Sequence, residues 1–174
     1  MKVLAFAATS SKNSINKHLV NYAAKQIKDA QVELLDINDY EMPLFSEDRE
    51  KELGQPELAK AFYQKLGEAD VIVISFAEHN GSYTAAYKNL FDWTSRINMQ
   101  MFQNKPVIML ATSPGPGGAG TVLATAQGSA PYFAADVKGA ISVPSFYDNF
   151  DTENGQLTNK DLIDEILSAI SLLY

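Results

Sequence analysis

The sequence predicts an α/β fold in which one five-stranded parallel sheet is covered by helices on both faces. Short runs that are apolar at almost every position alternate along the chain with longer segments whose apolar residues recur every three or four positions. The first pattern is typical of strands buried on both faces, and the second is typical of amphipathic helices. Because parallel strands need crossover connections, the alternation indicates a parallel sheet.

The first part of the chain supplies two of the five strands. Residues 3–8 (VLAFAA) form the first predicted strand, and residues 32–37 form the second. Between them, residues 14–28 carry apolar side chains at four-residue spacing, which predicts a helix. Residues 38–55 have no clear period, and we interpret the charged run 46–52 as a solvated connection.

The middle of the chain contains the clearest strand. Pro56 suits a helix start, and the helix is predicted to cover residues 56–67. Residues 70–75 (DVIVIS) are the third strand, and the polar loop 76–84 follows it. The next helix carries four large side chains, Tyr87, Leu90, Phe91 and Trp93.

Two strands and two helices complete the predicted fold. In order, these elements are strand 107–111, loop 112–120, helix 121–133, strand 137–143 and a helix that begins at residue 158. Gly139 interrupts the last strand. Thr158 and Asp161 have the spacing of a Thr-x-x-Asp cap at the start of the last helix.

Composition places the chain among single-domain globular proteins. With 174 residues, of which 46% are hydrophobic and 20% charged, we expect one soluble domain over residues 1–174. No apolar run approaches the length of about 20 residues that a membrane span needs. The absence of cysteine excludes disulfides and cysteine metal sites and favours a cytoplasmic location. The net charge of -7 argues against nucleic-acid binding.

Three loops follow the first, third and fourth predicted strands. The carboxyl ends of parallel strands share one edge of a sheet, so these loops are expected to lie together. With the strand order 2-1-3-4-5, the first and third strands flank the point where the order reverses and where ligands bind. The sequence therefore predicts a ligand site at this edge.

The first loop, residues 8–16 (ATSSKNSIN), is rich in short hydrogen-bonding side chains and opens a helix. Unpaired N–H groups and the helix dipole at such a position attract anions. The loop therefore predicts a phosphate site. A polar turn with an N-cap residue is the alternative interpretation.

The third loop contains a G-x-G-x-x-G pattern at Gly115, Gly117 and Gly120. Its place after the fourth strand argues against a dinucleotide fingerprint, which follows the first strand. Thr121 stands where a P-loop needs lysine. The glycines allow close approach of the backbone to a flat ligand, and a plain turn is the alternative.

No motif for hydrolysis or metal binding is present. His18 lies on a predicted helix, and His79 lies beside Glu78 in the second loop. These side chains form neither a nucleophile and base pair nor a ligand cluster. We therefore assign no catalytic side chain and no metal site.

Taken together, the three loops resemble a known family. The second loop reads AEHNGS over residues 77–82 and is followed by YKNLFDW over residues 87–93, and the third reads SPGPGG over residues 113–118. This combination resembles the NAD(P)H-dependent FMN reductases, a short flavodoxin-like group that includes azo, quinone and chromate reductases. The resemblance implies a flavodoxin-like three-layer sandwich with FMN as cofactor and NAD(P)H as co-substrate.

The resemblance also implies which residues contact FMN. The first loop would hold the phosphate, the second loop would lie along one edge of the flavin ring, and the third loop would lie along the other edge. The implied residues are Thr9, Ser11, Ser14 and Asn16; Glu78, His79, Asn80, Gly81 and Ser82; and Ser113, Gly115, Gly117 and Gly118. The first loop departs from the family pattern, because Ser11 stands where the family has an arginine that meets the phosphate. Lys12 is a candidate replacement.

Three functions remain open at this level. The resemblance implies an enzyme that takes hydride from NAD(P)H and reduces a small acceptor such as a quinone, an azo compound, a free flavin or a metal oxyanion, with ping-pong kinetics. A flavodoxin-type electron carrier is the second possibility, and the acidic composition favours it. The third is a flavin-free binding domain, which the missing arginine favours.

An apolar surplus near the third helix predicts self-association. Its members are Phe91, Trp93, Ile97, Met99, Met101 and Phe102. One helix face needs fewer apolar side chains than this, and such a surplus often marks an interface. The resemblance likewise implies a homodimer or homotetramer.

Overall fold

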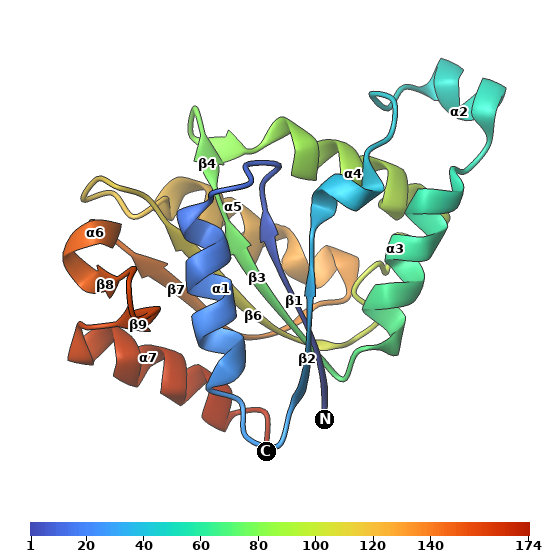
Figure 1. Cartoon of the computed structure of the whole chain (residues 1–174). Helices are drawn as coiled ribbons and strands as arrows, with labels where there is room; N and C mark the ends of the chain where they lie inside the picture. The colour runs from blue at the N-terminus through green and yellow to red at the C-terminus, as the bar shows by residue number, and fades with distance from the viewer.

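The computed structural model describes residues 1–174 and contains one five-stranded parallel sheet (Figure 1). Its strands are β1 (Lys2–Ala8), β2 (Gln31–Leu35), β3 (Val71–Phe76), β6 (Pro106–Thr112) and β7 (Asp136–Val143). They lie in the order β2-β1-β3-β6-β7, which confirms the predicted order 2-1-3-4-5. Every neighbouring pair is parallel.

Helices connect these strands, and short irregular elements interrupt the connections. The helices are α1 (Ile15–Lys25), α2 (Glu47–Leu53), α3 (Glu57–Glu68), α4 (Ala85–Ile97), α5 (Gly120–Ser129), α6 (Phe146–Asn149) and α7 (Lys160–Ser171), with the 3₁₀ turns η1 (Ile37–Tyr40) and η2 (Ala130–Phe133). Two small hairpins pair β4 (Glu78–His79) with β5 (Ser82–Tyr83) and β8 (Phe150–Asp151) with β9 (Gln156–Leu157). None of the helices combines the length and the apolar composition that crossing a membrane requires.

The sheet separates two hydrophobic cores. Because side chains alternate along a strand, Leu4 and Phe6 of β1 face one core, and Val3 and Ala5 face the other. Helices α3, α4 and α5 cover the first face, and α1 and α7 cover the second (Figure 1). Both faces of the central strands are therefore buried, as their continuous apolar sequence predicts.

Three predicted boundaries are wrong. The second strand ends at Leu35 because Asp36 caps the 3₁₀ turn η1. The charged run 46–52 forms α2, which Ser46 caps by accepting a hydrogen bond from the Arg49 N–H, although the run is solvated as expected. The cap of α7 is Asn159, whose Oδ1 accepts from two backbone N–H groups of the first turn, and Thr158 lies just outside the helix.

The predicted apolar surplus near the third helix is not a surface. Trp93 and Met101 have no exposed area, and Phe102 is also buried. The indole N–H of Trp93 donates to the Pro43 carbonyl oxygen at 2.7 Å. Of this group, only Met99 is largely exposed, at 63%. These residues fill the core beneath α4, so the premise for an interface there was wrong.

A different segment projects from the body of the protein. No residue of α2 is buried, and Leu44 in the segment before the helix and Leu53 at its last position are 68% and 52% exposed. Figure 1 shows α2 standing away from the sheet beyond α3 and α4. Contacts with α4 anchor this segment: the Arg96 side chain pairs with Glu50 at 2.9 Å, and the Phe45 ring packs edge-on against Trp93 with ring centroids 5.1 Å apart. We call residues 44–53 the α2 arm.

Two glycines test how closely the helices pack on the sheet. A Cβ on Gly139 would lie 2.5 Å from the Cβ of Ala169 in α7, whereas a Cβ on Gly128 in α5 would meet nothing within 4 Å. Gly139→Ala should therefore lower the free energy of unfolding by about 1–3 kcal/mol. Gly128→Ala should raise it by up to about 1 kcal/mol because alanine favours the helix. Urea unfolding of both variants measures the difference, and equal effects would contradict this packing.

Candidate functional site

A buried asparagine joins the ends of three elements at the carboxyl edge of the sheet. Asn16 lies in the first turn of α1 and is 2% exposed. Its Oδ1 accepts from the Ser75 hydroxyl at 2.7 Å and from the Thr112 N–H at 3.3 Å. Its Nδ2 donates to the Thr112 carbonyl oxygen at 3.3 Å. The Asn16 amide is thus occupied within the protein, behind the predicted phosphate loop.

Two threonines extend this network along the same edge. The Thr84 hydroxyl donates to the Ala8 carbonyl oxygen at 2.9 Å and accepts from the Tyr87 N–H, which ties the start of α4 to the end of β1. The Thr112 hydroxyl donates to the Val143 carbonyl oxygen at 2.6 Å, which ties β6 to β7. Thr84 and Thr112 were absent from the predicted site. Their signal in the sequence is a polar residue placed at or near the end of a strand.

The first loop presents backbone donors that have no partner. The N–H groups of Ser10, Lys12, Asn13 and Ser14 make no hydrogen bond within the chain. Ser14 is the N-cap of α1 and accepts from the Asn16 N–H at 3.2 Å, so the capping interpretation is correct. Free N–H groups at the positive end of a helix form an anion site. The residues present therefore fit a phosphate group.

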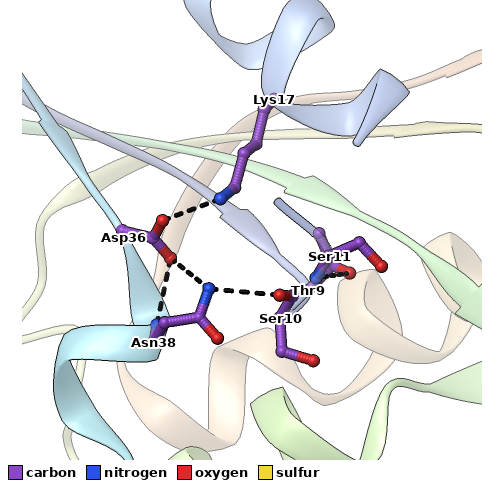
Figure 2. Close-up of polar contacts among 6 residues, drawn as sticks. All are labelled: Thr9, Ser10, Ser11, Lys17, Asp36 and Asn38. Carbon is purple, nitrogen blue, oxygen red and sulfur yellow. Dashed lines mark hydrogen bonds and ion pairs between the residues drawn. The ribbon is translucent and has the colours of Figure 1, made fainter. Parts of the chain in front are cut away.

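In the first loop, two hydrogen bonds hold the peptide unit that joins Ser10 to Ser11 (Figure 2). The Asn38 Nδ2 donates to the Ser10 carbonyl oxygen at 3.1 Å, and the Ser11 N–H donates to the Thr9 hydroxyl oxygen at 3.2 Å. Thr9 itself is buried. The peptide between Ser10 and Ser11 therefore has a defined orientation within the fold.

Asn38 is in turn positioned by an ion pair (Figure 2). Its Nδ2 also donates to Asp36 Oδ1 at 2.8 Å, and the Lys17 ammonium group pairs with Asp36 Oδ2 at 2.8 Å. Partial burial alone would raise the pKa of Asp36, but hydrogen bonds from Lys17 and Asn38 outweigh burial and lower the pKa below its usual value. Lys17 is thus occupied by Asp36, which leaves the exposed Lys12 as the free cation of the loop.

The second predicted loop is a hairpin whose turn uses two of the predicted site residues. Asn80 and Gly81 have φ values of 53° and 73°, as a two-residue type I′ turn requires. His79 and Ser82 flank this turn and are exposed. The Glu78 Oε2 accepts from the Val122 N–H at 2.8 Å, in the first turn of α5. Glu78 therefore fastens the hairpin to the helix that follows the third loop.

The hydrogen bond between Glu78 and the Val122 N–H also keeps a phosphate group from binding at the third loop. The Glu78 carboxylate occupies the positive end of α5, where the pyrophosphate of a dinucleotide fingerprint would have to bind. This arrangement agrees with the sequence interpretation that Gly115, Gly117 and Gly120 are not such a fingerprint.

The glycines of the third loop have different roles. Gly118 has φ 58°, and a Cβ there would lie 2.2 Å from the Ser142 hydroxyl oxygen, so the fold itself requires glycine. A Cβ on Gly115 or Gly117 would meet nothing within 4 Å. The Ser113 hydroxyl donates to the Gly115 carbonyl oxygen at 3.1 Å. Packing within the chain thus does not require glycine at positions 115 and 117, and the open space there leaves room for a flat ligand to approach the backbone.

Comparison with known proteins gives a consistent result. The family model of the NADPH-dependent FMN reductases matches residues 1–148. An NAD(P)H-dependent FMN reductase from Pseudomonas aeruginosa is 29% identical over 179 aligned positions, which cover 99% of this chain and 94% of the relative. A 2-hydroxy-1,4-benzoquinone reductase from a Burkholderia species is 27% identical over 167 positions, which cover 92% of this chain and 87% of the relative.

The fold has solved counterparts. The flavoenzyme NAD(P)H:acceptor oxidoreductase FerB from Paracoccus denitrificans superposes with a TM-score of 0.79 at 20% identity. The superposition covers 99% of this chain and 94% of that structure. It establishes the flavodoxin-like fold that the sequence predicts.

The hydrogen bond from Asn38 to Ser10 predicts that a change at Asn38 affects binding of the FMN phosphate and not binding of the flavin ring. Asn38→Ala frees the Ser10 carbonyl group and should weaken FMN binding by about 1 kcal/mol, the typical contribution of one hydrogen bond. Binding of riboflavin, which lacks the phosphate, should not change. Flavin fluorescence titration measures both affinities.

The matched control is Asn154→Ala, because Asn154 is also an exposed asparagine that donates to a nearby aspartate, here Asp151 in the β8–β9 hairpin. This variant should bind FMN as the wild type does. An equal loss of FMN and riboflavin affinity in Asn38→Ala would show that Asn38 does not act through the phosphate loop.

Proposed function

Because the chain belongs to the NADPH-dependent FMN reductase family, and is an FMN-dependent enzyme that uses NAD(P)H, we propose that it reduces a small acceptor by a ping-pong reaction. The acceptor classes are quinones, azo compounds, free flavins and metal oxyanions. Hydride from the nicotinamide is taken up first, and the oxidised nicotinamide leaves before the acceptor enters the same place.

The free N–H groups of the first loop are the observation that carries this proposal. Four backbone donors without partners, in the loop that leads into an 11-residue helix, match a phosphate that has a permanent negative charge. The hydroxyl groups of Thr9, Ser11 and Ser14 lie in the same loop. Asn16 acts from behind, by holding the start of α1 against β3 and β6. Lys12 supplies the positive charge that an arginine supplies in related sequences.

The other two loops account for an open, weakly selective site. In the proposal, residues 78–82 and residues 113–118 lie along the edges of the flavin ring through backbone groups. Bound FMN supplies the hydride chemistry, so the protein needs to bind and orient the reactants. Glu78 is occupied by the Val122 N–H, and His79 is the exposed titratable group of the hairpin. Few polar side chains face the acceptor, and its specificity is accordingly loose.

Rapid mixing tests the reaction. FMN-loaded protein mixed separately with NADH and NADPH should lose its flavin absorbance faster than free FMN does with at least one of them. Steady-state rates with a quinone should give parallel double-reciprocal lines, as ping-pong kinetics require. If neither nucleotide reduces the flavin faster than in free solution, the enzyme proposal fails, and an electron carrier explains the site better.

The α2 arm supports a proposal about assembly. The α2 arm is a ten-residue segment whose helix has no buried residue, and its end residues Leu44 and Leu53 leave apolar surface that a second copy would cover. We propose that the protein forms a homodimer through this arm, or a homotetramer that contains such a dimer. The contact replaces the one that the sequence predicted near the third helix.

Light scattering at micromolar concentration tests the assembly. The wild type should have at least the mass of a dimer, and Leu44→Glu combined with Leu53→Glu should reduce it to the monomer mass, because burying carboxylates at an apolar interface is unfavourable. The control is Leu167→Glu, which changes an exposed leucine on α7, on the opposite side of the sheet. A monomeric wild type would contradict the proposal.

A further inference from the structure

A cavity of about 540 Å³ adjoins the first loop, outside the residues assigned to FMN. It lies between the segment that follows β2 and the first half of α4. Its wall includes Ser10, Asn38, Tyr40, Glu41, Ala86 and Leu90. Residues of the hairpin 78–83 and of the glycine-rich third loop do not line it. The cavity is therefore a neighbour of the proposed flavin site and not part of it.

The size and lining of this cavity suit a small aromatic ligand. Its volume lies within the range of small-molecule sites. Ile37, Met42 and Leu90 provide apolar walls for a flat ring. Asn38 and Glu41 add polar groups. This combination of apolar walls and a few polar groups is typical of sites that bind small molecules, and a nucleoside has both the flat ring and the hydroxyl groups to match it.

The position of the cavity fits the adenosine half of the nicotinamide dinucleotide, which takes no part in hydride transfer. A nicotinamide dinucleotide joins two nucleosides through a pyrophosphate, so a nicotinamide at the flavin ring leaves its adenosine half at a distance. Ser10 belongs both to the cavity wall and to the first loop. Ala85 and Ala86, the first residues of the 13-residue helix α4, also line the cavity, and the positive end of that helix favours a pyrophosphate.

We propose that this cavity binds the adenosine half of the reductant and favours NADH over NADPH. The proposal rests on the proposed function, because it assigns a place to the substrate of that reaction. NADPH differs from NADH by a phosphate on the adenosine ribose, so the charges around the cavity decide between the two.

The charges around the cavity oppose an added phosphate. Glu41 is the charged residue of the lining, and no lysine or arginine is part of it. Lys17, the cation drawn in Figure 2, is paired with Asp36. Arg49 donates to the Leu44 carbonyl oxygen at the rim and is not a lining residue. A ribose hydroxyl can donate to a carboxylate such as Glu41, whereas a phosphate is repelled by it.

Binding of the adenosine half alone provides a test that does not depend on the reaction. The probes are ADP-ribose and its 2′-phosphorylated form, measured by calorimetry on the FMN-loaded protein. ADP-ribose should bind about tenfold more tightly, and Glu41→Lys should reverse the preference. Glu165→Lys makes the same change of charge on α7 and should leave the preference as in the wild type. Equal binding of both probes by wild type and Glu41→Lys would overturn the proposal.

Flavin reduction provides the second test, with reduced nicotinamide mononucleotide as a reductant that lacks adenosine. Ala86→Leu places extra volume in the cavity, and it should raise the apparent dissociation constant of NADH about tenfold without changing the rate with the mononucleotide. Ala124→Leu, at an exposed alanine of α5, is the matched control. An unchanged NADH affinity in Ala86→Leu would overturn the proposal.

The two proposals fail in different ways. If NADH, NADPH and the mononucleotide all leave the flavin oxidised, the proposed function is wrong, and the calorimetric comparison still decides whether the cavity binds adenosine. If the mononucleotide and NADH reduce the flavin but the cavity variants change neither nucleotide affinity nor preference, the reductase function stands and the assignment of the cavity is wrong.

Discussion

The arrangement of the site depends on one buried amide. Asn16 uses both ends of its side chain to connect the start of α1 with the ends of β3 and β6. A buried amide without partners would destabilise the protein, so these three elements have to meet in one register. Thr84 and Thr112 add contacts to β1 and β7. These hydrogen bonds therefore hold together the strand and helix ends from which the loops with the proposed ligand contacts extend.

The same pattern of hydrogen bonds leaves part of the backbone of the first loop without partners. Side chains satisfy the structural hydrogen bonds, and the N–H groups of Ser10, Lys12, Asn13 and Ser14 stay free for a ligand. The Asn38 amide and the Thr9 hydroxyl fix the peptide between Ser10 and Ser11 in advance. In the proposed phosphate site, a loop held by these contacts would lose less entropy on binding, which would offset part of the contact that an arginine makes in the family pattern.

The starts of α1 and α5 at this edge differ in whether a side chain binds their N–H groups as an anion would. The start of α1 is open, and the start of α5 is occupied by the Glu78 carboxylate. A helix start favours negative charge from either a side chain or a ligand, so a side chain there competes with a phosphate. The start of α1 is therefore the place where the proposed phosphate site has free N–H groups, and the start of α5 is not. Figure 1 shows how both helices approach the sheet from opposite faces.

The sequence by itself determined the parallel sheet and the three loops at one edge, because strand burial and helix periodicity are local patterns of apolar residues. The strand order 2-1-3-4-5 belonged to the flavodoxin-like fold that the sequence resembles, and the structure confirms it. The family resemblance added FMN. Tertiary structure alone decided the local contacts of the predicted site residues: the side chains of Asn16 and Glu78 form hydrogen bonds within the protein, and Asn80 and Gly81 form a turn. It also decided that Trp93, Met101 and Phe102 fill the core, whereas Leu44 and Leu53 are exposed. The physical reason is that hydrogen-bond partners and burial depend on residues distant in the chain, such as Asn16 and Thr112, which no local pattern connects.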